Sequence, residues 1–357
     1  MTVQRVLVLE SQTPFVRGGA EILSRELVGA LRAHGLEADL VSIPFRDNPR
    51  EELMAHATAW RLIDLSQALE RPVDAVIATK FPTYFVRHPA KVTWLVHQHR
   101  AAYELCGTPF SDFEHTERDV SLRKRLIELD TEMLAECVGR FSIAKTVSAR
   151  VEQYNGLSAE PVYHPPRLAA SLKPGGYGDY MLAVSRLEKV KRLDLAIDAF
   201  AHVPAPMRLV IAGEGSVRGD LEARIERQGL GSRVRLAGHV DDDTMIELMA
   251  GARGVLFAPF QEDYGYVTLE AFLSRKPVVT ASDAGGPLEF VQDGVNGFVR
   301  DPAPEALAEA VRALAADEGL ARRLGDSGYE LARLITWDGV VARLLSPVAG
   351  GSGPART

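Results

Sequence analysis

The sequence predicts an α/β protein built from two doubly wound, parallel-sheet domains that face each other across a cleft. Three observations predict this fold. The 357 residues are enough for two domains with cores of their own. Short runs rich in Val, Ile and Leu alternate with longer helical patterns, which is typical of parallel sheets covered by crossover helices. A Pro- and Gly-rich stretch interrupts this alternation at residues 167–178, and the alternation restarts after it.

The first domain is expected over residues 1–166. A helix is expected from about Ala20, because Leu23, Leu27 and Leu31 recur at i, i+4 and i+8 and form one apolar stripe. Another long helix is expected over residues 117–136. The short apolar runs predict strands at residues 6–9, 74–78, 92–96 and 141–147.

The second domain is expected over residues 179–335, after a linker at 167–178. Helices are expected from about residues 191, 217 and 265, and a terminal helix over 336–349 begins at Trp337. The apolar runs between them predict strands at residues 180–185, 208–212, 234–236, 254–258 and 277–281.

Composition limits the classes of function. The chain is 46% hydrophobic and 25% charged, as in ordinary globular proteins, and its net charge of −7 argues against a nucleic-acid-binding protein. Two cysteines, Cys106 and Cys137, are too few for a disulfide framework or a zinc cluster and favour a reducing compartment. No uncharged apolar stretch approaches the ~20 residues that span a bilayer. We therefore expect a cytoplasmic protein, with peripheral contact at the inner membrane face as the alternative.

One segment of the second domain has the features of a phosphate site. A strand ends near Pro259, a loop contains Glu262, and a helix begins around Gly265. Glycine allows a ligand close to the backbone, and the first amides of a helix lack internal partners and attract anions. Glu270 lies one turn inside, so its carboxylate is placed to accept hydrogen bonds from ribose hydroxyls. The alternative is that Gly265 and Glu262 only shape and cap the helix.

Two cations follow another strand of the same domain. Arg186 and Lys191 are expected in one strand-to-helix loop, where they would balance the charge of a diphosphate. A solvated helix start is the alternative.

Adjacent glycines, Gly18 and Gly19, follow the first strand and would let the backbone close over a ligand. Neither GxGxxG nor GxxxxGK[ST] occurs here, which argues against a nicotinamide enzyme and a P-loop hydrolase.

Taken together, these segments resemble the retaining glycosyltransferases of the GT-B architecture, often called glycosyltransferase group 1, whose two domains are Rossmann-like. The resemblance covers nearly the whole chain and is densest over residues 262–297. Its motifs are Gly18-Gly19-Ala20-Glu21, Ser185-Arg186-Leu187 with Lys191, Gly213-Glu214-Gly215, Gly238-His239-Val240, Gly285-Gly286 and Asp293-Gly294-Val295-Asn296-Gly297.

The resemblance implies transfer of a hexose-type sugar from a nucleotide-diphosphate sugar to a hydroxyl of a glycan, a lipid-linked saccharide or a small molecule. Configuration would be retained, and neither a cofactor nor a metal would be needed. Catalytic roles are implied for His97, Glu262, Arg186 and Lys191. Donor binding is implied for Gly18, Gly19, Gly213, His239, Val240, Gly265, Tyr266, Val267 and Glu270. The terminal helix would pack back toward the first domain.

Several points stay open. His99 is the alternative to His97 as the histidine that faces the donor sugar. Residues 241–243 are three aspartates, which we interpret as a helix cap and not as a metal-binding motif. A nucleotide-sugar epimerase and a non-catalytic nucleotide-sugar binder are the alternative functions. A basic cluster is interpreted as a solvated helix face, with membrane docking as the alternative; it consists of Arg118, Arg123, Lys124 and Arg125.

Two segments depart from the usual pattern of the family. Ser274-Arg275-Lys276 stands where a small residue and glycine are commoner, and it is expected in a helix exit turn away from the donor. His164-Pro165-Pro166 replaces the more usual Asn-Gly, so no role is transferred to it. The donor's base and sugar and the acceptor's identity are not predicted.

Overall fold

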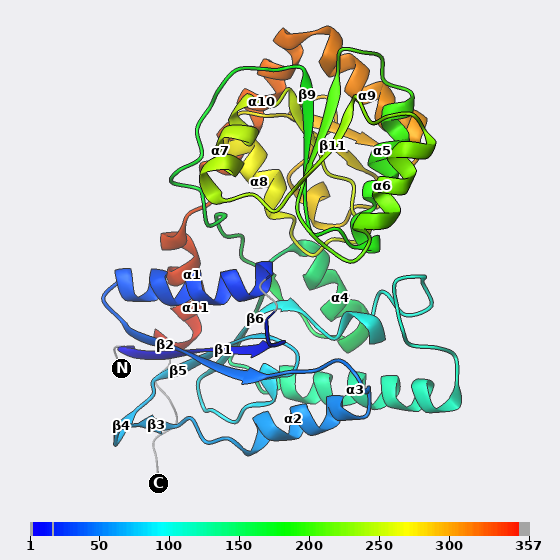
Figure 1. Cartoon of the computed structure of the whole chain (residues 1–357). Helices are drawn as coiled ribbons and strands as arrows, with labels where there is room; N and C mark the ends of the chain where they lie inside the picture. The colour runs from blue at the N-terminus through cyan, green and yellow to red at the C-terminus, as the bar shows by residue number, and fades with distance from the viewer. Residues whose placement is uncertain (1–2, 16–17, 350–357) are drawn as a thin grey trace. The chain divides into compact units, whose positions relative to one another are not determined.

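The computed structural model describes residues 3–15 and 18–349. They divide into two compact units (Figure 1). The first contains the described residues up to His164 together with those from Thr336, and the second is Pro165–Ile335. Each unit has its own parallel sheet covered by helices, so the predicted α/β class is confirmed.

The first unit is built on a six-stranded parallel sheet in the order β2-β1-β5-β6-β7-β8. Helices α1 and α11 lie on one face, and α2 and α3 on the other (Figure 1). The strands are β1 Arg5–Gln12, β2 Glu37–Pro44, β5 Ala75–Lys80, β6 Lys91–His97, β7 Gly139–Ser142 and β8 Glu160–Pro161, with a small hairpin of β3 Gln67–Ala68 and β4 Arg71–Pro72. The helices are α1 Gly19–Ala33, α2 Glu52–Leu62, α3 Glu117–Ala135, α4 Lys145–Asn155 and α11 Trp337–Ala349, with 3-10 turns η1 Thr83–Phe85 and η2 Arg100–Ala102.

The apolar stripe predicted on α1 is the face that packs on this sheet, since Leu23, Leu27 and Leu31 are all buried. Burial of such side chains contributes about 1.5–3 kcal/mol each, which is what fixes the helix on the strands. Helix α11 packs against the same unit through Trp337, whose ring lies 6.2 Å from Trp94 and 5.9 Å from His164.

The second unit has a six-stranded parallel sheet in the order β11-β10-β9-β12-β13-β14. Helices α5, α6 and α9 cover one face, and α7, α8 and α10 the other (Figure 1). The strands are β9 Tyr180–Val184, β10 Arg208–Ala212, β11 Val234–Gly238, β12 Gly254–Leu256, β13 Val278–Ala281 and β14 Gly297–Arg300. The helices are α5 Leu193–Ala201, α6 Arg218–Arg227, α7 Asp242–Gly251, α8 Tyr266–Leu273, α9 Pro304–Ala316 and α10 Glu318–Ala332, with 3-10 turns η3 Lys189–Lys191 and η4 Gly286–Glu289.

Two sequence expectations differ from the structure of the first unit. The strand expected over 141–147 stops at Ser142, and Thr146 and Val147 lie in α4 instead. Their β-branched side chains favour a strand locally, but burial of Val147 against the unit decides the conformation. Strand β2 was not expected, because it lies at the sheet edge and its partly exposed residues give no continuous apolar run.

The segment expected as a linker, residues 167–178, lies in the second unit. Tyr177 is part of that unit's core, and Lys276 fixes the glycines before it. Its Nζ donates to the carbonyls of Gly175 (3.3 Å) and Gly176 (2.6 Å) and lies 4.0 Å from the Tyr177 ring centroid. Burial lowers the pKa of Lys276 to about 8. Lys276, which belongs to the segment that departs from the family pattern, therefore fixes the start of the second unit.

In both sheets the strand order reverses once, between β1 and β5 in the first unit and between β9 and β12 in the second. Open α/β sheets bind ligands outside the carboxyl ends of the strands at such a switch point. The loops after these four strands are therefore the expected place for a ligand.

Among the described residues, none of the helices is both long and apolar enough to cross a membrane.

Candidate functional site

Two loops meet at the switch point of the second unit. Residues 185–192 follow β9 and residues 257–265 follow β12, and these strands are neighbours in the sheet. The backbone N–H of Phe260 donates to the carbonyl of Val190 at 2.9 Å. The sequence segments that suggested cations and a phosphate-binding helix end are therefore adjacent within this unit.

The two predicted cations differ in their surroundings. Arg186 is exposed, and its guanidinium makes no ion pair with any residue the structure describes. Lys191 ends the 3-10 turn η3 and pairs with the carboxylate of Glu262; their side chains are only 14% and 18% exposed. Lys191 and Glu262 were predicted as parts of two separate segments, and a contact between them was not expected from the sequence.

Arg192, which the sequence analysis did not single out, joins the two loops. Its backbone is left-handed, with φ 49°, a conformation that non-glycine residues rarely adopt. Its guanidinium donates to the carbonyls of Ala258 (2.9 Å) and Pro259 (2.6 Å) and to both carboxylate oxygens of Asp283 (2.8 and 2.6 Å). Arg192 therefore holds the loop after β12 beside Lys191. The basic run 189–192 was the only sequence signal for it.

Glu262 is held by its backbone as well as by its ion pair. Its N–H donates to the carbonyl of Ala284 at 2.7 Å, and its carbonyl accepts from the N–H of Gly286 at 2.7 Å. Gly285 has φ 77°, and a Cβ there would lie 2.5 Å from the Glu262 carbonyl oxygen. Only glycine fits, because two backbones pass in direct contact at this point.

Gly265 precedes α8 with φ 79°, and a Cβ there would lie 2.9 Å from the Pro287 side chain and 3.0 Å from Phe257. The chain can enter the helix at this place only without a side chain. Tyr266 is partly exposed at the first helical position, and Val267 is buried behind it. The first backbone amides of a helix lack partners within the helix, and this helix end is therefore a suitable seat for an anion.

Glu270 lies one turn into α8, and its carboxyl makes no hydrogen bond with any described residue. Burial raises the pKa of this carboxyl to about 7; Arg167 opposes the shift, and Asp242 adds to it. Arg167 and Asp242 themselves form an ion pair. Near neutral pH the group is thus divided between a hydrogen-bond donor form and an ionised acceptor form.

The remaining predicted residues of this unit follow β10 and β11. Gly213 has φ 140°, and a Cβ there would lie 1.8 Å from the Ser185 carbonyl, so the loops after β9 and β10 touch through their backbones. The exposed His239 donates its backbone N–H to Glu214 at 3.2 Å, and Val240 beside it is partly exposed.

The three aspartates that follow Val240 belong to the start of α7. Asp241 is the N-cap, and its side chain accepts a hydrogen bond from the Thr244 N–H at 2.8 Å. This geometry confirms the capping interpretation. Asp242 pairs with Arg167. The described residues contain no cluster of acidic, His or Cys side chains suited to a metal.

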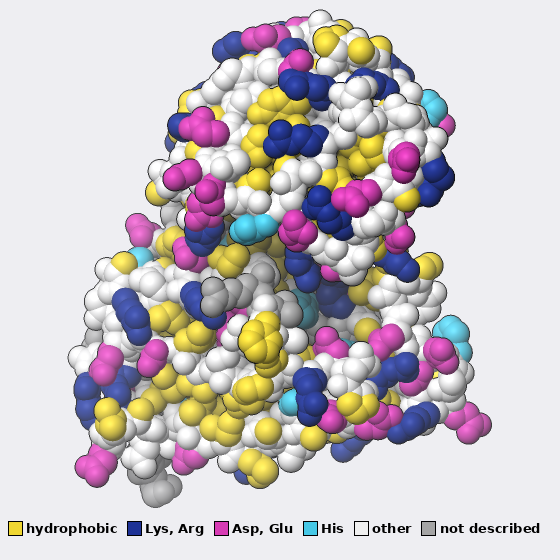
Figure 2. Space-filling view, viewed as in Figure 1, with side chains coloured by type: hydrophobic (Ala, Val, Ile, Leu, Met, Phe, Trp, Pro, Cys, Tyr) yellow, Lys and Arg dark blue, Asp and Glu magenta, His cyan; other side chains and the backbone are white. Residues whose placement is uncertain are grey.

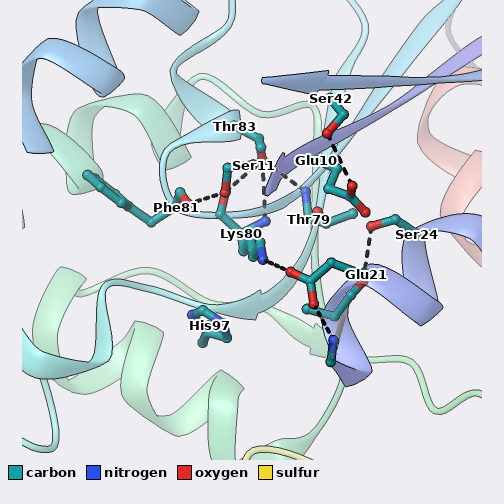
Figure 3. A network of polar contacts seen from close by, with 12 residues as sticks. Glu10, Ser11, Glu21, Ser24, Ser42, Thr79, Lys80, Phe81, Thr83 and His97 are labelled. Carbon is teal, nitrogen blue, oxygen red and sulfur yellow. Dashed lines mark hydrogen bonds and ion pairs between the residues drawn. The ribbon is translucent and has the colours of Figure 1, made fainter. Parts of the chain in front are cut away.

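The predicted residues of the first unit lie near its own switch point, in the region of Figure 3. Gly18 is the N-cap of α1, which begins at Gly19 after β1. The Gly18 N–H donates to Glu21 at 2.8 Å, and Lys80 at the end of β5 donates to the other oxygen of Glu21 at 2.6 Å. Lys80 was not predicted from the sequence.

The structure separates the two candidate histidines. His97 ends β6, and its backbone pairs with that of Lys80. Its Nδ1 lies 2.6 Å from the Gln98 carbonyl, which can only accept, so Nδ1 carries the proton. The His99 ring instead packs between Phe81 and Phe113, with centroids 5.8 and 5.9 Å away, and burial lowers its pKa.

The basic cluster on α3 is engaged locally. Arg118 pairs with Glu51, Lys124 and Arg125 pair with Glu128, and Arg123 donates to the Ala102 carbonyl at 2.6 Å. Figure 2 shows acidic side chains interspersed with basic ones over the visible surface. These contacts agree with a solvated helix face.

Comparison with known proteins relates part of the chain to a family. Residues 169–331 match the family model described as glycosyl transferases group 1. Human alpha-1,3/1,6-mannosyltransferase ALG2 is 28% identical over 46% of this chain and 43% of its own length. The D-inositol 3-phosphate glycosyltransferase of Xylanimonas cellulosilytica is 32% identical over 47% of this chain and 42% of its own. The chain thus spans less than half the length of these curated relatives.

Solved structures resemble the chain over almost its whole length. Anabaena Alr3699/HepE, solved with UDP and glucose, has a TM-score of 0.70 at 18% identity and covers 95% of this chain and 99% of its own. The sucrose-phosphate synthase of Thermosynechococcus elongatus has a TM-score of 0.73 at 17% identity, covering 96% and 98%. These likenesses show a shared fold. The matched segment, which forms most of the second unit, is similar to the group 1 glycosyltransferases.

Proposed function

We propose that this chain is a glycosyltransferase that transfers a hexose-type sugar from a nucleotide-diphosphate sugar to a hydroxyl group of an acceptor. One observation supports the proposal above the others. Within the second unit, the cations Arg186 and Lys191 follow β9 and the amino end of α8 follows β12, at the switch point of one sheet. Fixed positive charge together with the amino end of a helix is a combination that stabilises a diphosphate.

The chemical step is a displacement at the anomeric carbon. The bond from this carbon to the diphosphate oxygen breaks, a bond to the acceptor oxygen forms, and the hydroxyl proton passes to the departing phosphate. The negative charge that develops on the diphosphate is stabilised by Arg186, Lys191 and the α8 amides. We propose retention of configuration and no metal, because the two side-chain cations and the helix end would supply the charge stabilisation.

When no donor is bound, Lys191 and Glu262 form an ion pair with each other. When a phosphate pairs with Lys191, the Glu262 carboxylate loses that partner and becomes able to accept hydrogen bonds from hydroxyls of the sugar. The cost of taking its ion-pair partner from this largely buried carboxylate is then offset by these new bonds. Donor binding would thus exchange one charge pair for two sets of ligand contacts.

Other residues would hold the nucleotide and complete the site. Glu270 would accept hydrogen bonds from the ribose, and backbone groups at Gly265, Tyr266 and Val267 would meet sugar or phosphate. The base would lie along Gly213, His239 and Val240. Gly18, Gly19 and His97 of the first unit would meet the donor sugar.

The comparisons support the donor class more than the acceptor. The matched segment of the family lies in the unit that contains the proposed diphosphate groups, and the Anabaena neighbour was solved with UDP and glucose. The names of the relatives point to different transfers, including mannosyl transfer and transfer to D-inositol 3-phosphate. We therefore propose a hydroxyl acceptor without naming it.

The proposal is tested by measuring nucleotide release from a panel of UDP- and GDP-sugars, with and without hydroxyl acceptors. We expect acceptor-dependent release with at least one donor, and loss of most of it in Lys191→Ala and Glu270→Ala. Arg224→Ala is the matched control, because Arg224 forms a bidentate pair with Asp198 between α5 and α6. Interconversion of sugars without an acceptor would indicate an epimerase, and full activity of both variants would rule out this site.

A further inference from the structure

We propose that Lys80 is a positioning residue, which acts through Glu21 to set the Gly18–Gly19 turn for donor binding. This inference rests on the proposed function, because it concerns the turn that would close over the donor. Neither Lys80 nor its contact with Glu21 was expected from the sequence, since the two residues lie 59 positions apart.

A short chain of hydrogen bonds leads from Lys80 to the turn (Figure 3). Lys80 Nζ donates to Glu21 Oε1 at 2.6 Å, and Glu21 Oε2 accepts the Gly18 N–H at 2.8 Å. Gly18 has no side chain with which to cap α1, so Glu21 reaches back from the first turn and satisfies the backbone amide instead. The position of that amide therefore depends on how the Glu21 carboxylate is held.

Burial makes the Lys80–Glu21 pair mutually dependent. The Lys80 side chain is 11% exposed and that of Glu21 is 7% exposed, and an unpaired charge at such depth is strongly unfavourable. Burial alone would raise the pKa of Glu21, but Lys80 and the Gly18 amide outweigh it and lower the pKa. The carboxylate thus stays ionised, with each oxygen bound to one partner.

The main chain of Lys80 is fixed independently of this pair. The Thr83 hydroxyl donates to the Lys80 carbonyl at 2.7 Å, and its oxygen accepts from the N–H groups of Thr79 (3.0 Å) and Lys80 (3.3 Å). The Lys80 backbone also pairs with His97 on β6. One lysine therefore links the glycine turn to the strand end that contributes His97, and holds both features in register.

Lys91→Met provides a matched control for Lys80→Met. Lys91 is 1% exposed and pairs with Glu136 at 2.9 Å, so it too is a buried lysine with a carboxylate partner. It begins β6, whereas Lys80 ends β5, and these strands are parallel neighbours, so the two lysines lie at opposite ends of the strands. Both variants should lower the melting temperature, but only Lys80→Met should disturb the turn.

We expect Lys80→Met to raise the KM for the donor about tenfold, since small misplacement of a positioning group costs this much or more. The KM for the acceptor should change less. Hydrogen exchange at the first amides of α1 should also accelerate. Lys91→Met should leave the donor KM within about twofold of the wild type.

A double variant, Lys80→Met with Glu21→Met, guards against misfolding of the single one. It removes both charges of the Lys80–Glu21 pair and still lacks an acceptor for the Gly18 N–H, so the donor KM should again rise about tenfold. A folded variant of either kind with a wild-type donor KM would overturn the inference, as would an equal rise in Lys91→Met. Wild-type protein without transfer activity would instead refute the proposed function.

Discussion

The protonation state of the Glu270 carboxyl bears directly on the proposed ribose contact. Burial raises its pKa to about 7, against an ordinary value of about 4.3. Its neighbours Arg167 and Asp242 pair with each other, so their charges partly cancel at the position of Glu270. Its ionised form accepts hydrogen bonds, as a ribose diol requires, but folding alone favours the protonated form.

In the wild type, stability and UDP binding should depend on pH in opposite directions. Glu270→Gln, which cannot ionise, should lose both dependences. The folded-state pKa is raised, so the stability from the protonated carboxyl is complete below about pH 4.3 and is lost as pH rises through about 7. From pH 5 to 8 the melting temperature of the wild type should fall relative to that of the variant. As the pH rises from 6 to 8, the affinity of the wild type for UDP should increase, while the affinity of the variant should stay low.

Thermal melts and calorimetric titration with UDP measure both effects. Glu309→Gln, an exposed change on α9, is the control and should follow the wild type throughout. Parallel melting curves for the wild type and Glu270→Gln would contradict the assigned pKa.

The loops after β9, β12 and β13 depend on contacts between elements. Gly285 allows the residues around 262 and 285 to pass backbone against backbone, and Arg192 ties the strand ends to Asp283. These loops lie outside the regular hydrogen bonding of the sheet, so such contacts decide where Lys191 and Glu262 lie.

Asp283→Asn should weaken UDP binding about tenfold. It removes the charge that balances Arg192, and one guanidinium N–H would then face the NH2 group of the Asn side chain, which is also a donor. Asp198→Asn is the matched control, since Asp198 makes the corresponding bidentate pair with Arg224 on the same unit. The control should lose stability comparably and keep its affinity for UDP. Equal loss of affinity in both variants would mean that the Arg192–Asp283 pair acts only on stability.

At the scale of the whole molecule, each unit has its own sheet, and the proposed diphosphate and nucleotide contacts lie in one of them. The second unit contains Arg186, Lys191, Glu262 and Glu270 together with a continuous core. A ligand of these groups adds its binding free energy to the stability of the folded form.

UDP at about a hundred times its Kd should stabilise the protein by about 2.7 kcal/mol. This stabilisation, and the rate of sugar transfer, should be the same in EDTA, because the proposed site uses side-chain cations for the phosphates. Differential scanning calorimetry and a transfer assay with and without chelator make the comparison. Loss of both on chelation would require a metal and would refute this part of the proposal.

The sequence by itself determined the local features: the alternation of strands and helices, the apolar stripe of α1, and the segments around Gly18, Arg186 and Gly265. Each follows from the periodicity or conformational freedom of neighbouring residues, so no tertiary information was needed. Tertiary structure alone decided which side chains pair. Lys80 with Glu21 and Arg192 with Asp283 join residues 59 and 91 positions apart. Short-range patterns contain no signal for such pairs, because packing of whole elements sets the distance between them.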